Sequence, residues 1–140
     1  MIAYNTAQMK NILSKRRRNI LQKSLKLLNR GALMVEGTAK ESIQRGPKTG
    51  RTYTRGGVTH TASASGEPPA TDTGFLVSNI THNFAELGDK MTAQVLSNAK
   101  YSKFLEFGTR KMDERPFLQP ALERNKRKIR ALFKMGNLTK

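Results

Sequence analysis

Few side chains in this 140-residue sequence are of the types that carry out acid–base, nucleophilic or metal chemistry. There is no cysteine, and the only histidines are His60 and His82. The carboxylate and imidazole groups that a nuclease site could use are present in Asp72, His82 and Glu106, but nothing in the spacing of these residues supports such a site. A metal site needs three or four converging ligands, and no spacing of His, Asp and Glu here supplies them. The sequence therefore predicts a protein that is not an enzyme and that binds no cofactor or metal.

Other motifs of enzymes are missing from the sequence as well. It contains no Ser-His-Asp order, nucleophile elbow or phosphate-binding glycine loop. Gly56-Gly57 lacks the following helix that a phosphate loop needs. His82 falls on the apolar face of a predicted sheet, opposite Val95, so we expect a packed histidine at the edge of the core.

Glu106 is the carboxylate with the clearest structural role, because apolar residues flank it on both sides. A buried carboxylate must be paired, or its pKa rises and it becomes neutral. We expect Glu106 to be partly buried and paired with Arg110 or Arg115. The alternative is an exposed Glu106 that interacts only with Lys103, one helical turn earlier.

Residues 100–122 form the element that must position Glu106. The apolar residues at its start recur at i, i+3 and i+4 and share one helical face: Tyr101, Phe104 and Leu105. Gly108 stands where a helix C-cap needs a residue that tolerates a positive φ. Pro116 and Pro120 suit the first turn of a second helix. We expect a helix, a stop, a short extended link and a helix, forming a corner that closes the core.

The sequence from Met9 to Ile43 has the periodicity of a long helix. Its apolar residues fall on one face: Met9, Leu13, Ile20, Leu21, Leu25, Leu28, Ala32, Val35 and Ala39. Gly31 and Gly37 each weaken a helix by about 1 kcal/mol relative to alanine, which leaves room for a kink or break near them. Gly46-Pro47 is expected to end the helix.

A polar hairpin is predicted between residues 51 and 61, because Gly56-Gly57 separates two β-favouring runs. In that register Tyr53 faces His60, and threonines line the other side. Neither face is apolar enough to bury, and such a ribbon is marginal alone. We therefore expect an arm that becomes ordered against a neighbouring subunit or partner. The alternative is a disordered loop.

Residues 62–74 are expected to form a stiff, extended strap, because proline fixes φ and pushes the preceding residue towards extended geometry. Asp72 or Thr73 is a candidate cap for a short helix through Phe75, Leu76 and Ile80. The candidate interface residues lie on the arm and this strap: Arg51, Tyr53, Arg55, His60, Glu67, Pro68, Pro69 and Asp72.

Residues 79–97 are predicted to form a second hairpin with Gly88-Asp89 at its turn. The register pairs Leu87 with Lys90, Phe84 with Ala93, His82 with Val95 and Ile80 with Ser97. One face is then apolar and the other polar, as in a half-buried antiparallel sheet. We expect the long helix and residues 100–122 to cover the apolar face.

Together these elements predict an α+β fold, with a long N-terminal helix and C-terminal helices on a small antiparallel sheet and a protruding hairpin. We expect a single domain, residues 1–140. Its parts are the helix (1–45), the arm and strap (46–74), the sheet and corner (75–122) and a basic helix and tail (120–140). The basic helix has a narrow apolar stripe and is expected to stop at Gly136. No apolar run approaches the ~20 residues of a membrane span, and the start lacks a hydrophobic signal core. We expect a soluble protein made in a cytoplasm.

The net charge of +16 predicts an acidic partner surface, nucleic acid, or both. The alternative is charge that only keeps the protein soluble. The basic residues gather on two helices: Arg16, Arg17, Arg18, Lys126, Arg127, Lys128 and Arg130. Each group either faces solvent or contacts phosphates or an acidic partner.

Two blocks of the sequence, residues 65–76 and 101–122, resemble a family of small tail-completion, or head–tail joining, proteins of long-tailed phages and prophages. The blocks follow in the family's order and at similar spacing. Their signature residues are Gly74, Tyr101, Leu105, Glu106, Phe107, Gly108, Arg115, Pro116, Phe117 and Pro120. The family usually carries a basic residue where Phe75 stands.

This resemblance implies a structural protein of the virion neck that is assembled in the host cytoplasm. It implies a hexamer-like ring, and partners among the connector, stopper, tail terminator and tail tube proteins. Weak contact with DNA in the channel is compatible with such a ring. The alternative is a basic protein that binds DNA without sequence specificity; this reading lacks a recognisable DNA-binding motif.

Overall fold

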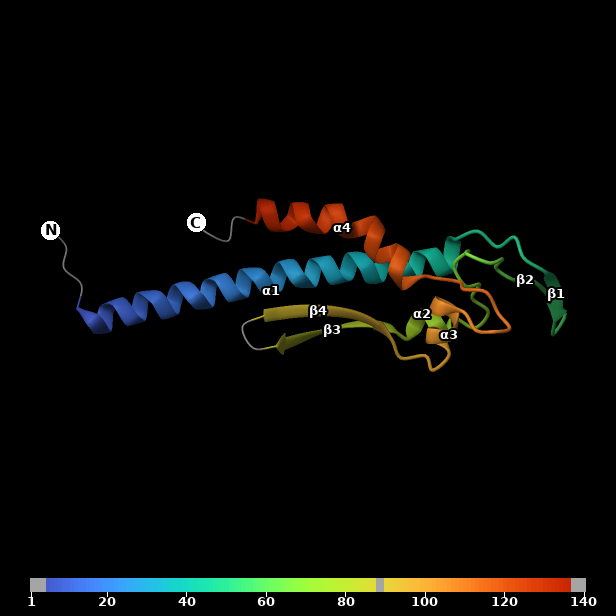
Figure 1. The fold of residues 1–140 in the computed structure, drawn as a ribbon, viewed down its shortest axis with the longest axis horizontal. Helices are drawn as coiled ribbons and strands as arrows, with labels where there is room; N and C mark the ends of the chain where they lie inside the picture. Colours follow the sequence, from blue (N-terminus) through green and yellow to red (C-terminus); the bar gives the residue numbers. More distant parts are fainter. Residues whose placement is uncertain (1–4, 88–89, 137–140) are drawn as a thin grey trace.

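The computed structural model describes residues 5–87 and 90–136 and has an α+β fold (Figure 1). The elements in chain order are α1 Thr6–Arg45, β1 Thr52–Arg55, β2 Val58–Thr61, α2 Phe75–Ser78, β3 Ile80–Leu87, β4 Lys90–Ser97, α3 Ser102–Phe107 and α4 Leu118–Met135. The β3–β4 hairpin and α4 lie along opposite sides of α1, and the β1–β2 hairpin stands at one end of the molecule (Figure 1). This arrangement confirms the expected fold class.

Helix α1 begins with a capping box, in which two residues satisfy each other's backbone N–H groups. The backbone N–H of Gln8 donates to Oδ1 of Asn5 at 2.8 Å, and that of Asn5 donates to Oε1 of Gln8 at 3.0 Å. The helix runs without interruption through Gly31 and Gly37 and ends at Arg45, before Gly46. The predicted C-terminal end of the helix is confirmed, and the helix does not break at either glycine.

Helix α4 runs back along α1 and is fixed to it by a buried polar side chain. Nδ2 of Asn125 donates to Oγ1 of Thr38 at 2.8 Å and to the carbonyl oxygen of Ala121 at 2.9 Å. Ile129 lies over Gly31, and α4 ends at Gly136 against Leu27. The stop at Gly136 is as predicted, whereas the apolar stripe of α4 gave no sign that Asn125 would be buried.

The β3–β4 hairpin has the predicted register, including the pairs Ile80 with Ser97, His82 with Val95 and Phe84 with Ala93. The Gly88-Asp89 turn lies outside the described residues. Ile80 is fully buried against α1 and Val95 packs beside it, which confirms the covered face. Phe84, further from the core, keeps nearly half of its surface exposed.

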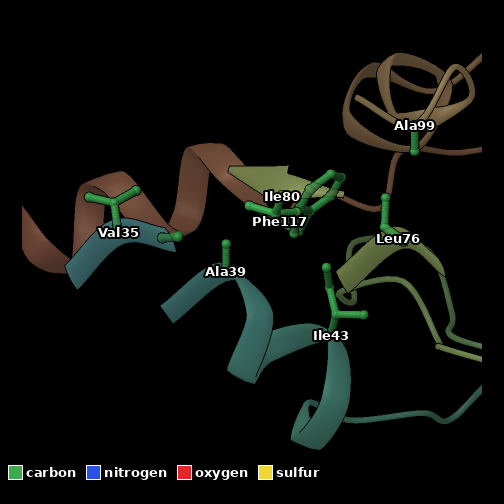
Figure 2. Close-up of a cluster of buried hydrophobic side chains, with 8 residues drawn as sticks. Val35, Ala39, Ile43, Leu76, Ile80, Ala99 and Phe117 are labelled. Carbon is green, nitrogen blue, oxygen red and sulfur yellow. The ribbon is translucent and has the colours of Figure 1, made fainter. Parts of the chain in front are cut away.

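The buried core forms where the second half of α1 meets α2, the start of β3 and the start of α4 (Figure 2). It contains Val35, Ala39, Ile43, Leu76, Ile80, Ala99, Phe117 and Ala121. Phe117 is 1% exposed, but the other aromatic residues of the corner, Tyr101, Phe104 and Phe107, are largely exposed. The prediction that the whole corner closes the core was therefore wrong for three of its four aromatic rings.

The short helix α2 also differs from the prediction. It covers Phe75–Ser78 and has Gly74 as its N-cap, at φ 74°. Oγ1 of Thr73 accepts a long hydrogen bond of 3.4 Å from the backbone N–H of Phe75, whereas Asp72 does not cap the helix. Ile80 lies in β3 rather than in the helix.

The first half of α1 extends beyond the ends of α4 and of the β3–β4 hairpin (Figure 1). Its apolar residues remain substantially exposed: Met9, Ile12, Leu13, Ile20, Leu21 and Leu25. The second half of α1 thus covers the sheet, whereas residues 6–26, about 30 Å of helix, lie beyond the packed elements. None of the helices in the described ranges is long and apolar enough to cross a membrane.

Candidate functional site

The β1–β2 hairpin has the predicted register, with Tyr53 opposite His60 and the threonines paired on the other side. The Tyr53 and His60 rings stack with their centroids 5.6 Å apart. Every side chain of the two strands except that of His60 is exposed. The hairpin is therefore formed, and it buries neither of its faces in the described part of the chain.

Asp72 of the strap connects this hairpin to the rest of the molecule. Nη1 of Arg55 donates to Oδ2 of Asp72 at 3.1 Å, and Nδ1 of His60 lies 3.7 Å from Oδ1 of the same carboxylate. The structure thus brings together four of the predicted interface residues: Tyr53, Arg55, His60 and Asp72. Because the Arg55 and Asp72 side chains are exposed, this ion pair adds little stability and instead orients the hairpin.

Glu67 holds the base of the hairpin through three hydrogen bonds. Its carboxylate accepts from the backbone N–H and the hydroxyl of Thr49 at 2.9 and 2.6 Å, and from the backbone N–H of Ala64 at 2.8 Å. The Thr49 hydroxyl, followed by the two backbone N–H groups, lowers the pKa of Glu67. Burial lowers the pKa of nearby Lys48, and the negative charge of Glu67 offsets part of this lowering.

A groove of about 400 Å³ lies between the hairpin, the strap and the α2–α3 region. Tyr53, Arg55 and Asp72 line it on the hairpin side, and Phe75 and Tyr101 line it on the other. The Phe75 and Tyr101 rings are 6.3 Å apart. Of the remaining predicted interface residues, Pro69 lines this groove and is buried, whereas Arg51 is exposed outside it and Pro68 is half-buried.

Glu106 is 8% exposed, but its partner is not an arginine. Oε2 accepts from the backbone N–H groups of Phe117 and Leu118 at 2.9 and 3.1 Å, and Oε1 accepts from that of Gln119 at 2.7 Å. The predicted pairing with Arg110 or Arg115 was wrong, because the carboxylate meets the start of α4, where free N–H groups and the helix dipole stabilise negative charge.

Arg115 instead ties the corner to the strap. Its backbone N–H donates to the carbonyl oxygen of Leu105 at 2.6 Å, and its Nε donates to that of Ser63 at 3.2 Å. The backbone N–H of Gly66 also donates to the carbonyl oxygen of Glu114, at 2.9 Å. The two blocks of signature residues therefore meet in space, and the strap is fixed to the corner.

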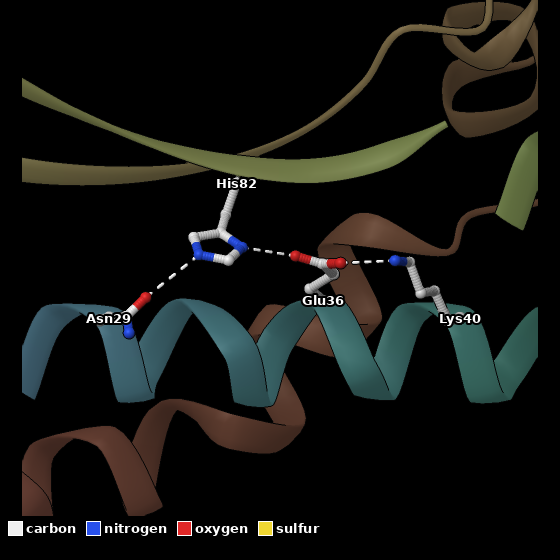
Figure 3. Close-up of polar contacts among 4 residues, drawn as sticks. All are labelled: Asn29, Glu36, Lys40 and His82. Carbon is white, nitrogen blue, oxygen red and sulfur yellow. Dashed lines mark hydrogen bonds and ion pairs between the residues drawn. The ribbon is translucent and has the colours of Figure 1, made fainter. Parts of the chain in front are cut away.

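A polar network between α1 and β3 was not predicted from the sequence (Figure 3). Nδ1 of His82 donates to Oε2 of Glu36 at 2.5 Å, and Nε2 of His82 lies 3.1 Å from Oδ1 of Asn29. Nζ of Lys40 donates to the other oxygen of Glu36 at 2.5 Å. His82 is half-buried at the edge of the core, as predicted, and it also links the sheet to α1 through Glu36.

This network should make stability depend on pH. Burial alone would raise the pKa of Glu36, but hydrogen bonds from Lys40 and His82 and their charges outweigh it and lower the pKa below 4.5. A lowered folded-state pKa stabilises the fold above about pH 4.5, and this stabilisation is lost as pH falls through the folded-state value. Urea unfolding at pH 6 should show Glu36→Gln to be less stable than the parent by about 1–2 kcal/mol.

The difference between the parent and Glu36→Gln should shrink as pH falls from 4.5 towards 3. Glu41→Gln is the matched control, because Glu41 is exposed on the same helix and pairs with the exposed Arg45, at 3.7 Å. It should show almost no difference at either pH. A Glu36 effect that is the same at pH 3 and pH 6 would contradict the assigned ion pair.

The predicted basic residues lie on two separate surfaces. Arg16, Arg17 and Arg18 are on the projecting half of α1, where residues 6–26 contain seven basic residues and no acidic one. Lys126, Arg127, Lys128 and Arg130 are exposed on α4, which packs on α1 near Gly31. About 20 Å of helix separates the two groups. Within residues 5–87 and 90–136, no three His, Asp or Glu side chains are grouped so that they could hold a metal ion.

One comparison with known proteins identifies a family. A family model described as "Bacteriophage HK97-gp10, putative tail-component" matches residues 7–108. The match includes α1, which the resembling blocks did not cover, and it ends at residue 108, inside the block at 101–122. No curated protein and no solved structure shows a significant match. Since the matched region is well over half of the 140 residues, the chain belongs to the HK97-gp10-like family of phage tail components.

Proposed function

We propose that this chain is a structural protein of the phage neck that works by forming a ring and by docking onto connector or tail proteins, without catalysing a reaction. The observation that carries this proposal is the β1–β2 hairpin, which is fixed at its base and exposed on both faces. A ribbon of two strands that buries neither face gains little stability from its own chain. Its exposed side chains are therefore available to a neighbouring molecule.

A closed ring requires a heterologous interface, in which one surface of a copy contacts a different surface of the next copy. The hairpin supplies one such surface, with Tyr53 and Val58 as its exposed apolar side chains. We assign the face of α4 that carries the exposed side chains of Arg127 and Lys128 to the opposite side of the ring or to an acidic neighbour. The proposed assembly in the virion is a hexamer-like ring. The proposal is consistent with a free protein that is a monomer before assembly.

Sedimentation velocity of the full chain mixed with neck and tail proteins tests this proposal. The double variant Tyr53→Ser, Val58→Ser should fail to enter the complex and should keep the parent melting temperature, because both side chains are exposed. The control is Leu33→Ser, which removes a similarly exposed apolar side chain from α1 and should assemble normally.

A parent protein that stays monomeric and binds none of the neck or tail proteins would overturn the proposal. Normal assembly of the Tyr53→Ser, Val58→Ser variant would remove the hairpin from the interface. A monomer in the absence of partners is compatible with the proposal, since such a ring is able to close on the growing particle.

The second candidate function is DNA binding without sequence specificity. The observation that favours it is the projecting half of α1, with seven basic and no acidic residues. Binding through phosphates would weaken steeply with salt, because each neutralised phosphate releases counterions. A gel shift across a salt series separates the two functions: tight binding near physiological salt would favour the DNA-binding function.

A further inference from the structure

An apolar groove of about 570 Å³ lies along one side of α1. Leu28, Gly31, Ala32 and Val35 of α1 form one part of its lining. The others come from β4, α3 and α4: Ala93, Val95, Phe107, Leu118, Leu122 and Phe133. Leu122 and Phe107 are 47% and 80% exposed, so apolar side chains at the groove face solvent.

The groove continues into the exposed stripe on the projecting half of α1. Leu25 and Leu21 precede Leu28 by three and seven residues, which places all three on one helical face. Leu13 and Ile20 line a smaller hollow of about 290 Å³ further along the helix. We call the groove and the apolar side chains on this side of α1, from Leu13 to Val35, the apolar track; this part of α1 is about 30 Å long.

Basic side chains border the apolar track. Lys103 lines the groove from α3, and Arg16 and Arg17 line the smaller hollow. On α4, Arg130 precedes Phe133 by three residues and Lys126 follows Leu122 by four, so both lie beside the groove, and Lys126 is also paired with Glu123 at 3.3 Å. Among the described residues that line the groove, the acidic one is Glu106, and its carboxylate is occupied by the start of α4.

A straight apolar track with basic edges is complementary to an amphipathic helix that has an apolar stripe and acidic flanks. A second copy does not supply such a helix, because α1 contains ten basic and two acidic residues and α4 six and one. DNA would contact the basic edges but would leave the apolar floor in water. We propose that the apolar track binds an acidic amphipathic helix of a different protein.

This inference rests on the proposed docking function, since it gives the chemistry of one partner. It assigns that partner to a surface separate from the β1–β2 hairpin. The two surfaces therefore allow one copy to contact its neighbour in the ring through the hairpin and a different protein through the apolar track.

Fluorescence anisotropy with designed peptides of about 18 residues, ~27 Å as a helix, tests the proposal. The probe has leucines at i, i+3, i+4 and i+7 and glutamates on the flanks. One control peptide replaces the glutamates with lysines, and a second replaces the leucines with serines. The acidic leucine peptide should bind the full-length chain at least about tenfold more tightly than either control.

Substitutions locate the bound peptide on the molecule. Leu122→Asp places a negative charge in the groove at an exposed position and should weaken binding about tenfold. Leu33→Asp makes the same change on α1 outside the apolar track, at a residue that is 51% exposed, and should leave affinity within about twofold. The Tyr53→Ser, Val58→Ser variant should bind the peptide as the parent does.

Equal binding of the acidic and basic peptides, or no loss with Leu122→Asp, would overturn the proposal. Self-association that blocks the peptide would assign the apolar track to a second copy, and displacement by duplex DNA would assign it to nucleic acid; either result overturns it. If no peptide binds but the hairpin variant fails to assemble, the inference fails and the proposed ring stands. If the peptide binds and the hairpin variant assembles normally, the inference stands and the hairpin is not the ring interface.

Discussion

Glu106→Gln should lower the melting temperature by roughly 10 °C, because this carboxylate caps the whole start of α4. The first four backbone positions of a helix lack N–H partners within the helix. At the start of α4 these are Phe117, Leu118, Gln119 and Pro120. Glu106 accepts from the first three N–H groups, at 2.7–3.1 Å, and proline has none. One side chain from α3 thus satisfies every free donor.

A glutamine at this position keeps one acceptor oxygen but turns an NH₂ group towards the N–H donors. At least one buried donor then loses its partner, at a cost of about 1–3 kcal/mol. The substitution also removes the negative charge that interacts with the helix dipole, worth up to about 2 kcal/mol in a partly buried site. Together these effects predict a loss of about 2–4 kcal/mol in the free energy of unfolding. Glu106→Ala, which removes all three acceptor contacts, should destabilise the fold more.

The measurement is thermal unfolding followed by circular dichroism at neutral pH. Glu123→Gln is the matched control, because Glu123 is exposed on α4 and pairs with the exposed Lys126, at 3.3 Å. It should change the melting temperature by no more than about 2 °C. An unchanged melt for Glu106→Gln would show that water or another group satisfies the start of α4 equally well.

Much of the fold could be predicted because the relevant interactions are local in sequence. The Gly56-Gly57 pair predicted the register of the first hairpin, and alternating side chains with the Gly88-Asp89 pair predicted that of the second, since a shift of one residue would reverse every side chain. The C-terminal ends of α1 and α4 follow in the same way from Gly46-Pro47 and Gly136. In each case the residues that decide the structure lie within a few positions of it.

The interactions that were missed join residues that are distant in the chain. The sequence shows that apolar residues flank Glu106, but not that its oxygens reach backbone N–H groups eleven to thirteen residues later. Glu36 and His82 are 46 residues apart, and Asn125 and Thr38 are 87 apart. Side-chain type alone does not identify these partners, because a carboxylate accepts equally well from an arginine, a histidine or a helix start.

Periodicity also failed to show where the apolar stripe of α1 stops being covered. The same spacing of three and four residues runs through both halves of the helix, but only the second half meets the sheet and α4. The charge pattern did contain a signal. Residues 6–26 carry seven basic residues and no acidic one, a composition better suited to contact with another molecule than to packing inside one domain.

Gly108→Ala is the second substitution expected to have a large effect, a fall in melting temperature of roughly 10 °C. Gly108 ends α3 with φ 70° and ψ −177°, a backbone region that essentially only glycine occupies. The sequence predicted the positive φ, and the chain then leaves in an extended direction towards residues 109–116. Forcing a residue with a Cβ into this region costs about 1–3 kcal/mol.

A Cβ at Gly108 would also lie 3.0 Å from the backbone nitrogen of Glu114 and 3.0 Å from the carbonyl oxygen of Met112. These are backbone atoms of a tight turn, closed by the hydrogen bond of 2.7 Å from the N–H of Thr109 to the carbonyl oxygen of Met112. They have less freedom to move away than the end of a side chain would have. The close contact therefore adds to the conformational cost, and we expect a total of about 3 kcal/mol.

Gly37→Ala is the matched control for Gly108→Ala, and its effect should have the opposite sign. No atom lies within 4 Å of a Cβ placed at Gly37, which is an exposed position inside α1. Alanine should stabilise the helix there by about 1 kcal/mol and raise the melting temperature by a few degrees. If both substitutions raised it, the corner after α3 would have to accept a Cβ, and the backbone conformation assigned to Gly108 would be wrong. A fall for Gly108→Ala alone would show that this corner, which holds Glu106 against α4, depends on a glycine.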